Sequence, residues 1–113
     1  MKTNFENRSF QFWQYRVSHG ELLVRSARGG TNTHNVDLRF DGVDYVDVAR
    51  TMLGLHIEDP TAEDHERAEE RLAKKLSLAS VFVLVSQGRR FLIVAARMSV
   101  NENELDIFES PFG

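Results

Sequence analysis

Histidines are the first residues to consider for chemistry, because the chain has no cysteine and only four histidines. They are His19, His34, His56 and His65, and no two have the H-x-x-x-H spacing that places a pair of zinc ligands on one helix face. On a strand, His56 and Glu58 would share a face, but a metal would still need a third ligand. We therefore expect no metal site and no cofactor, with histidines in turns and on the surface.

Three aspartates recur at intervals of three residues, at Asp41, Asp44 and Asp47. On a helix they would line one side, where a hard cation such as calcium could bind. The calcium-loop motif D-x-[DN]-x-[DN]-G is missing, however, and Asp41 precedes Gly42, a dipeptide typical of hairpin turns. The sequence therefore favours aspartates in a turn and on solvent-exposed faces.

Motifs of nucleotide-binding and hydrolytic enzymes are absent from the sequence. There is no G-x-x-x-x-G-K-[ST], no G-x-G-x-x-G and no G-x-S-x-G. Gly29 and Gly30 alone indicate a flexible turn rather than a phosphate-binding loop. We assign no catalytic residue, and an enzymatic activity is not favoured.

Aromatic residues beside arginines would suggest RNA binding, because bases stack on aromatic rings. Phe12, Trp13 and Tyr15 precede Arg25, and the segment 71–97 carries six basic residues and no acid. The formal net charge is −3, however, whereas nucleic-acid-binding proteins usually present a basic surface. The register of the first hairpin would place Trp13 and Tyr15 on its apolar face, so we expect core packing rather than base stacking, and nucleic acid is not favoured as a partner.

Length and composition predict one soluble domain spanning residues 1–113, since 42% of the residues are apolar and 27% are charged. The longest apolar runs, at 81–85 and 91–96, are far shorter than the roughly 20 residues of a membrane-spanning helix. The first residues lack the apolar stretch of a secretory signal. We therefore expect a cytoplasmic location, no membrane partner, and a loosely ordered tail at residues 1–8.

The hydrophobic pattern predicts an α+β fold. A mainly antiparallel sheet of about seven or eight short strands is expected to pack against one principal amphipathic helix at about 60–76. Asp59 is the expected N-cap of that helix and Pro60 its first residue. The apolar stripe of the helix is thin, so we expect it to lie on the sheet as a lid.

A first hairpin is predicted from strands at 10–17 and 22–27, with a turn at His19-Gly20 and with Val17 opposite Leu22. This register places apolar side chains on one face and mainly polar side chains on the other. An antiparallel hairpin that covers a core has this pattern.

Residues 36–40 alternate between apolar and charged side chains, which predicts a strand. Asp41-Gly42 is expected to turn this strand into a second hairpin, with Phe40 opposite Val43. Residues 45–53 fit either a strand or a helix. We favour a strand up to about residue 47 and a helical turn from 48 to 53.

The most apolar segments, 81–85 and 91–96, are predicted to pair as a hairpin that turns at Gln87-Gly88. Both faces of this hairpin are apolar, which is typical of strands covered on both sides. Leu105 and Ile107 suggest a further short strand near the end of the sequence.

One face of this apolar hairpin is predicted to lack cover within a single chain. The helix is expected to cover the face formed by Phe82, Leu84, Phe91 and Ile93. The opposite face is then a candidate interface, formed by Val81, Val83, Leu92 and Val94. Because monomers seldom expose large contiguous apolar patches, this favours a homodimer. The alternative is that the first hairpin curls over this face, which would give a closed or two-layered sheet and a monomer.

Three functions are therefore open. The sequence favours a non-catalytic protein–protein interaction module that binds another protein or a second copy of itself. The alternative is a small-ligand-binding or enzymatic domain with a pocket between helix and sheet. The third is single-stranded RNA binding through the basic segment 71–97.

Overall fold

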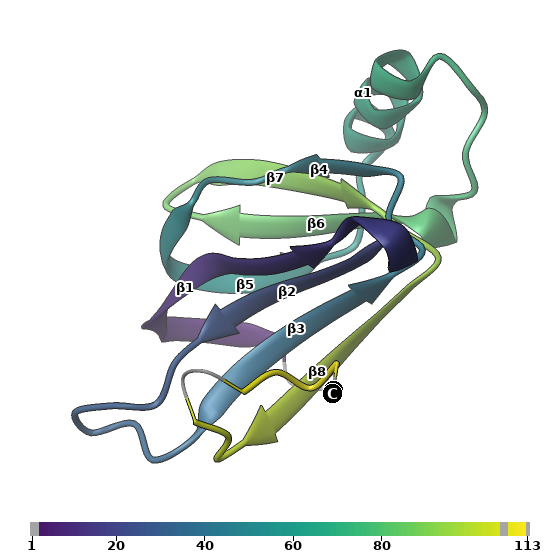
Figure 1. Cartoon of the computed structure of the whole chain (residues 1–113). Helices are drawn as coiled ribbons and strands as arrows, with labels where there is room; N and C mark the ends of the chain where they lie inside the picture. The colour runs from purple at the N-terminus through teal and green to yellow at the C-terminus, as the bar shows by residue number, and fades with distance from the viewer. Residues whose placement is uncertain (1–2, 107–108, 113) are drawn as a thin grey trace.

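A computed structural model describes residues 3–106 and 109–112 of the chain (Figure 1). Within these residues, eight strands and one α-helix form an α+β fold, which confirms the prediction. The strands are β1 (Asn4–Arg16), β2 (Glu21–Ser26), β3 (Asn35–Asp41), β4 (Tyr45–Asp47), β5 (Thr51–Glu58), β6 (Val81–Ser86), β7 (Arg89–Val94) and β8 (Arg97–Asn103). The helix α1 spans Ala62–Leu72, and two short 3-10 helices span Val17–His19 (η1) and Leu78–Ser80 (η2). No helix in these residues is long and apolar enough to cross a membrane.

The strands form one antiparallel sheet in the order β4-β7-β6-β5-β1-β2-β3-β8, and this sheet closes on itself. β3 and β4 are parts of one bent segment, and β7 and β8 are parts of another that pairs with it on both sides of the bend. At the bend the amide of Ala96 donates to the carbonyl of Asp41 at 2.9 Å, and the amide of Asp44 donates to the carbonyl of Val94 at 2.8 Å. The sheet therefore folds into the two layers seen in Figure 1, with β4, β6 and β7 above β2, β3 and β8.

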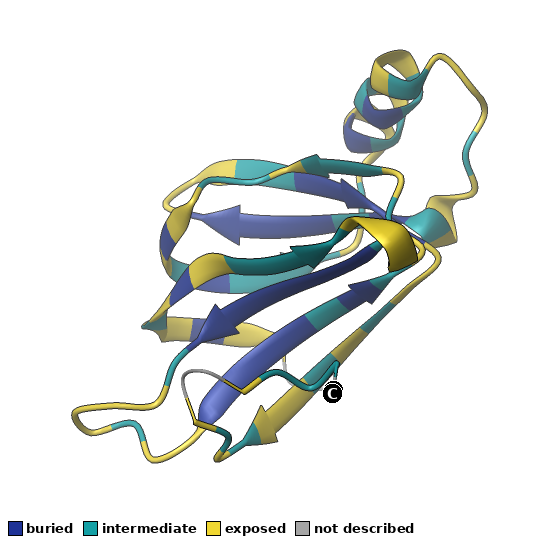
Figure 2. Cartoon of the chain, viewed as in Figure 1, coloured by how far each residue is buried: buried dark blue, intermediate teal, exposed yellow. Residues whose placement is uncertain are grey.

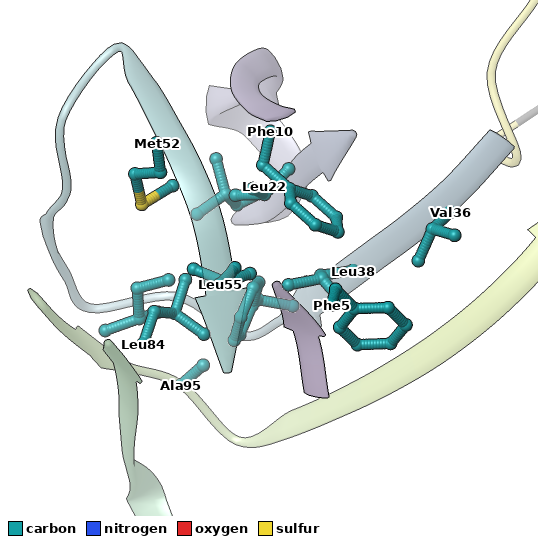
Figure 3. Packing of buried hydrophobic residues seen from close by; sticks show 12 residues of the cluster. Phe5, Phe10, Leu22, Val36, Leu38, Met52, Leu55, Leu84 and Ala95 are labelled. Atoms are coloured by element: carbon teal, nitrogen blue, oxygen red, sulfur yellow. The ribbon is translucent and has the colours of Figure 1, made fainter. Parts of the chain in front are cut away.

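The main core fills the space between these two layers (Figure 3). Strands from both layers supply its side chains, and the rings of Phe5 and Phe10 meet edge to face with 5.6 Å between centroids. The buried members are Phe5, Phe10, Leu22, Val24, Val36, Leu38, Phe40, Met52, Leu55, Leu84, Ile93 and Ala95. Removing side chains of this size from water is the dominant stabilising contribution, at about 1.5–3 kcal/mol each.

A second, smaller core lies between α1 and the outer face of β6 and β7, where Ala68 and Leu72 of the helix provide the cover. The sheet residues of this core are at most 7% exposed, and they are Val81, Val83, Val85, Leu92 and Val94. The residues proposed as a candidate interface are therefore covered by the helix of the same chain.

The prediction of which face the helix covers was wrong. The face formed by Phe82, Leu84, Phe91 and Ile93 points into the main core instead. The narrow stripe of α1 packs against small valine side chains, whereas large aromatic rings need the deeper space between two layers. The expectation of a homodimer loses its premise at this face, because the predicted gap in cover is absent there.

The local elements of this C-terminal half are close to prediction. Leu84 lies opposite Phe91 across the turn at Gln87-Gly88, as expected. The helix is shorter than the predicted 60–76 at both ends, because Thr61 rather than Asp59 is its N-cap and Ala73 ends it in a left-handed conformation with a φ of +53°. The Thr61 hydroxyl accepts from the Asp64 amide at 3.1 Å while the Asp64 carboxylate accepts from the Thr61 amide at 2.8 Å. This reciprocal capping box fixes the start of the helix.

The N-terminal half departs further from prediction. β1 begins at Asn4, so residues 4–8, expected in a loose tail, are part of the sheet. Leu22 lies opposite Tyr15 rather than Val17, because η1 and Gly20 form a longer connection than the predicted turn. A bulge between Phe12 and Gln14 shifts the register further along the same ladder.

The second hairpin and the helical turn were also predicted wrongly. β3 pairs with β2 and β8, and β4 pairs with β7, so Asp41-Gly42 is a corner between layers rather than a hairpin turn. Residues 48–50 form a connection, and β5 begins at Thr51. Leu105 lies outside the strands, and Ile107 falls outside the described residues.

Candidate functional site

The histidines and aspartates that the sequence analysis considered as metal ligands are dispersed over the structure. His19 lies in η1, His34 in the β2–β3 connection and His65 on α1. Asp41 and Asp44 form ion pairs with an arginine and a lysine respectively. Among the residues that the structure describes, no group of three or more metal-ligating side chains comes together.

The free edge of β8 is a feature that the sequence analysis missed. β8 pairs with β3 along all seven of its residues, and among the described residues no backbone hydrogen bond joins its other side to another strand. An unpaired strand edge presents a row of N–H and C=O groups that another chain can use. Figure 2 shows β8 mostly exposed or intermediate, whereas β2 in the same layer is buried.

The chain leaves this edge open because β6 begins too late to reach it. β6 starts at Val81 opposite Val94, and the residues before it form η2 instead of extending the strand past β8. Ser77 stabilises η2, since its hydroxyl accepts from the Ala79 amide at 3.1 Å and its carbonyl accepts from the Ser80 amide at 3.1 Å. A local serine cap thus prevents the ladder from continuing.

An apolar groove of about 220 Å³ adjoins the free edge. Its apolar lining residues include Met98 of β8, Ile57 of β5 and Phe82 of β6. The remaining lining residues are Thr3, Glu58, Asp59, Pro60, Leu78, Ala79 and Val81. Leu78 at this cavity is 59% exposed. We refer to the free side of β8 together with this cavity as the edge groove.

A chain of charged side chains holds the wall of the edge groove that contains Glu58. His56 bonds through Nδ1 to Glu6 at 2.8 Å and through Nε2 to Glu58 at 2.6 Å. Arg90 donates to Glu58 at 2.7 Å and to Asp64 at 2.7 Å. The chain therefore links β1, β5, β7 and the first turn of α1.

The pKa values of these groups follow from their partners. Hydrogen bonds to Glu6 and Glu58 raise the pKa of His56, and hydrogen bonds from Arg90 and His56 lower the pKa of Glu58. Hydrogen bonds from Arg90, aided by those from Thr61, lower the pKa of Asp64 to about 2. Because carboxylates occupy both ring nitrogens of His56, its protonated form is favoured and the imidazole offers no free nitrogen for general base catalysis.

The opposite side of β8 is fixed by a buried polar network. The Asn103 amide nitrogen donates to the Asp37 carboxylate at 2.7 Å, and the Asn35 amide nitrogen donates to the Asn103 side-chain oxygen at 2.8 Å. Asp37 also accepts two hydrogen bonds from Arg25, at 2.7 and 2.9 Å. One side of β8 is therefore anchored while its other side stays open.

The features considered for RNA binding do not come together at one place. The basic residues of the segment 71–97 are spread over the end of α1, β7 and β8, and two of them, Lys74 and Arg90, form ion pairs with acids. Tyr15 packs against the main core, and Trp13 lies under the guanidinium of Arg25 at 5.4 Å.

The edge groove had one signal in the sequence, namely the alternation of Met98 and Val100 with Ser99 and Asn101. Its partner β3 and its open side depend on pairing between distant segments, which no local pattern reveals. Comparisons with protein-family models, with curated proteins and with solved structures find no match for this chain.

Proposed function

We propose that the chain is a protein-interaction module that binds an extended segment of a partner protein by strand addition to β8. The observation that carries this proposal is a seven-residue strand edge that is open on one side and adjoins an apolar groove. In strand addition, main-chain hydrogen bonds supply affinity and pockets for alternate side chains supply specificity.

The groove defines the side chains of the partner. Side chains of an added strand alternate between the two faces of the sheet. Those on the inner face would meet Met98, Ile57 and Phe82, which favours apolar residues at every second position. Natural proteins usually protect an edge of this length with charges, prolines or a covering element. Among the described residues the free side of β8 has no proline and no covering strand; its charged residues are Arg97 and Glu102, and Glu102 shares the inner face with Met98 and Val100.

The charges around the groove favour a basic partner. Asp59 lines the wall and forms no ion pair among the described residues, whereas Glu102 on β8 interacts electrostatically with Arg8. The stretch 98–113 contains four acids and no basic residue. We therefore expect a segment with apolar residues at alternate positions and lysine or arginine at its ends, since opposite charges increase the rate of association and select partners.

A labelled peptide tests this proposal. The probe alternates valine and threonine over seven positions and has a lysine at each end; one control replaces both lysines by glutamate, and another replaces the central residues by proline. Fluorescence anisotropy should show saturable binding of the lysine probe, at least about ten-fold weaker binding of the glutamate peptide, and none of the proline peptide. Backbone NMR shifts on binding should be concentrated in residues 97–103.

Two variants of β8 separate the groove from the strand as a whole. Met98→Arg places a cation in the groove and should abolish binding, whereas Ser99→Arg places the same cation on the outer face and should leave binding within about two-fold. Thermal melts of both variants establish that they fold. The proposal is rejected if the lysine probe does not bind, if NMR shifts map to another element, or if free protein sediments as a dimer of the 13.0 kDa chain through β8.

A further inference from the structure

A second cavity lies away from β8, in a wedge where β5 and β6 separate. These strands pair only from His56 opposite Val85 to Glu58 opposite Val83, and the first half of β5 pairs with β1 alone. The wedge between the start of β5 and the β6–β7 turn holds a cavity of about 420 Å³. Cavities of about 300–1,000 Å³ are typical of small-molecule sites.

The floor of this wedge cavity is apolar. Met52 is 2% exposed and belongs to the main core, and Ala49 and Phe91 pack against the same core. Leu53 on the rim is 57% exposed. Phe12, whose amide donates to the Arg50 carbonyl at 2.9 Å beside the cavity, is 39% exposed. Large apolar side chains are thus left accessible at one end of the molecule.

The rim supplies one cation. Arg89 lines the cavity at the end of the β6–β7 hairpin, and among the described residues it has no acidic partner. The other polar lining groups are neutral: Thr51, Gln87 and Ser86, whose hydroxyl donates to the Leu53 carbonyl at 3.2 Å. An apolar floor with a single free guanidinium on the rim is complementary to a molecule with an apolar body and one anionic group.

We propose that the wedge cavity binds a small amphipathic anion, with the apolar body against Met52 and Phe91 and the carboxylate at Arg89. This site is separate from the edge groove, because no residue lines both cavities. It also differs from the pocket between helix and sheet that the sequence suggested, since α1 contributes no lining residue. A peptide strand fits less well, because on the open side of β5 the Leu53 carbonyl already accepts from the Ser86 hydroxyl.

Laurate is the probe, with dodecyltrimethylammonium as the matched cation of the same chain length. Isothermal titration calorimetry below the micelle concentrations should show saturable binding of laurate at one site. The cation should bind at least about ten-fold more weakly. NMR shifts on laurate binding should include Met52, Leu53 and Arg89.

Two variants and a control locate the ligand. Arg89→Gln should weaken laurate binding about ten-fold, the loss expected for one charge-assisted hydrogen bond. Thr51→Trp fills the wedge from an exposed position and should abolish binding, while Arg97→Gln on β8 should leave it unchanged. The proposal is overturned if laurate does not saturate, if the cation binds as well, or if Arg89→Gln and Thr51→Trp leave laurate affinity unchanged. The peptide experiment on β8 involves neither Arg89 nor Thr51. A negative laurate result would therefore not count against the proposed strand addition.

Discussion

Arg25 and Asp37 are both fully buried, although they lie on the outer face of β2 and β3. They are covered because Trp13 stacks on the guanidinium and because the segment after β8 returns over this face, where Arg25 donates to the Glu109 carbonyl at 2.9 Å. Two charges removed from water are stable only when each is fully hydrogen-bonded, and Asn103 completes the contacts of Asp37. The pair therefore depends on contacts from several distant segments.

Asp37→Asn should lower the free energy of unfolding by about 3–5 kcal/mol, because it leaves the Arg25 charge buried without its counter-ion. The double variant Arg25→Met with Asp37→Leu should cost less than the single variant, since it removes both charges and keeps apolar volume. Urea denaturation of the three proteins measures this order. A loss below about 1 kcal/mol for Asp37→Asn would show that water reaches the pair.

At the scale of single residues, the sequence predicted the face of the sheet on which a side chain lies better than it predicted the partners of that side chain. The first hairpin was expected to have one apolar face and one mainly polar face, and the outward direction of Arg25 agrees with that pattern. Asp37 as its partner was not foreseen, because the pairing of β2 with β3 spans a glycine-rich connection whose length does not define a register. His56 and Glu58 were expected to share a face and do so, but Glu6 and Arg90 come from other strands.

At the scale of elements, α1 is joined to the sheet by few side chains. Its apolar contact is limited to the small core around Ala68, and its first turn is held by the contact of Asp64 with Arg90 of β7. The carboxylate of Asp64 also caps the helix, so one side chain both starts the helix and attaches it to the sheet. Protonation of Asp64 should therefore weaken both contacts.

Acid should destabilise the protein as Asp64 becomes protonated. Its pKa is lowered from 3.8 to about 2, so its contribution is complete above about pH 4 and is lost as the pH falls through 2. That shift corresponds to about 2 kcal/mol. Asp64→Asn keeps a capping oxygen but has no carboxylate charge to lose. Between pH 5 and pH 2 the unfolding free energy of the wild type should therefore fall by about 2 kcal/mol more than that of this variant. Urea titrations measure this. Asp47 is exposed and has no ion pair within residues 3–106 and 109–112, so Asp47→Asn should follow the wild type.

Elements with local signals were predicted well, and elements with distant partners were not. The β6–β7 hairpin has its register set by the two residues Gln87-Gly88, and the helix has a capping residue and charged ends that complement its dipole. β8 and β5 have no comparable local signal. A helical turn was expected from 48 to 53, but residues 51–53 belong to β5, whose pairing with β1 is interrupted between Phe5 and Ser9.

At the scale of the whole molecule, closure of the sheet depends on one corner. Two bent segments pair with each other there, and the bend occurs at Gly42 in one and at Ala95 and Ala96 in the other. The sequence indicated a turn at Asp41-Gly42, but it did not indicate whether this turn closes a hairpin or bends one segment from one layer to the other. The same dipeptide suits both equally. The choice depends on β2 and β7 as partners, which are far away in the sequence.

Gly42 is required at this corner for two separable reasons. Its φ of +64° lies in the left-handed region, and a Cβ atom there would lie 2.9 Å from the Cβ of Ala96. Gly30 has a similar φ of +55° with nothing within 4 Å of its added Cβ, so it isolates the backbone effect.

Gly30→Ala should cost about 1–2 kcal/mol, and Gly42→Ala should cost more because it also separates the two segments. Ala96→Gly in the Gly42→Ala protein should recover part of the excess, since it removes the opposing atom. Thermal and urea unfolding of the four variants, with Ala96→Gly alone to complete the cycle, measures these differences. Equal losses for Gly30→Ala and Gly42→Ala, or no coupling between positions 42 and 96, would show that the corner relaxes freely and that close approach there does not hold the sheet closed.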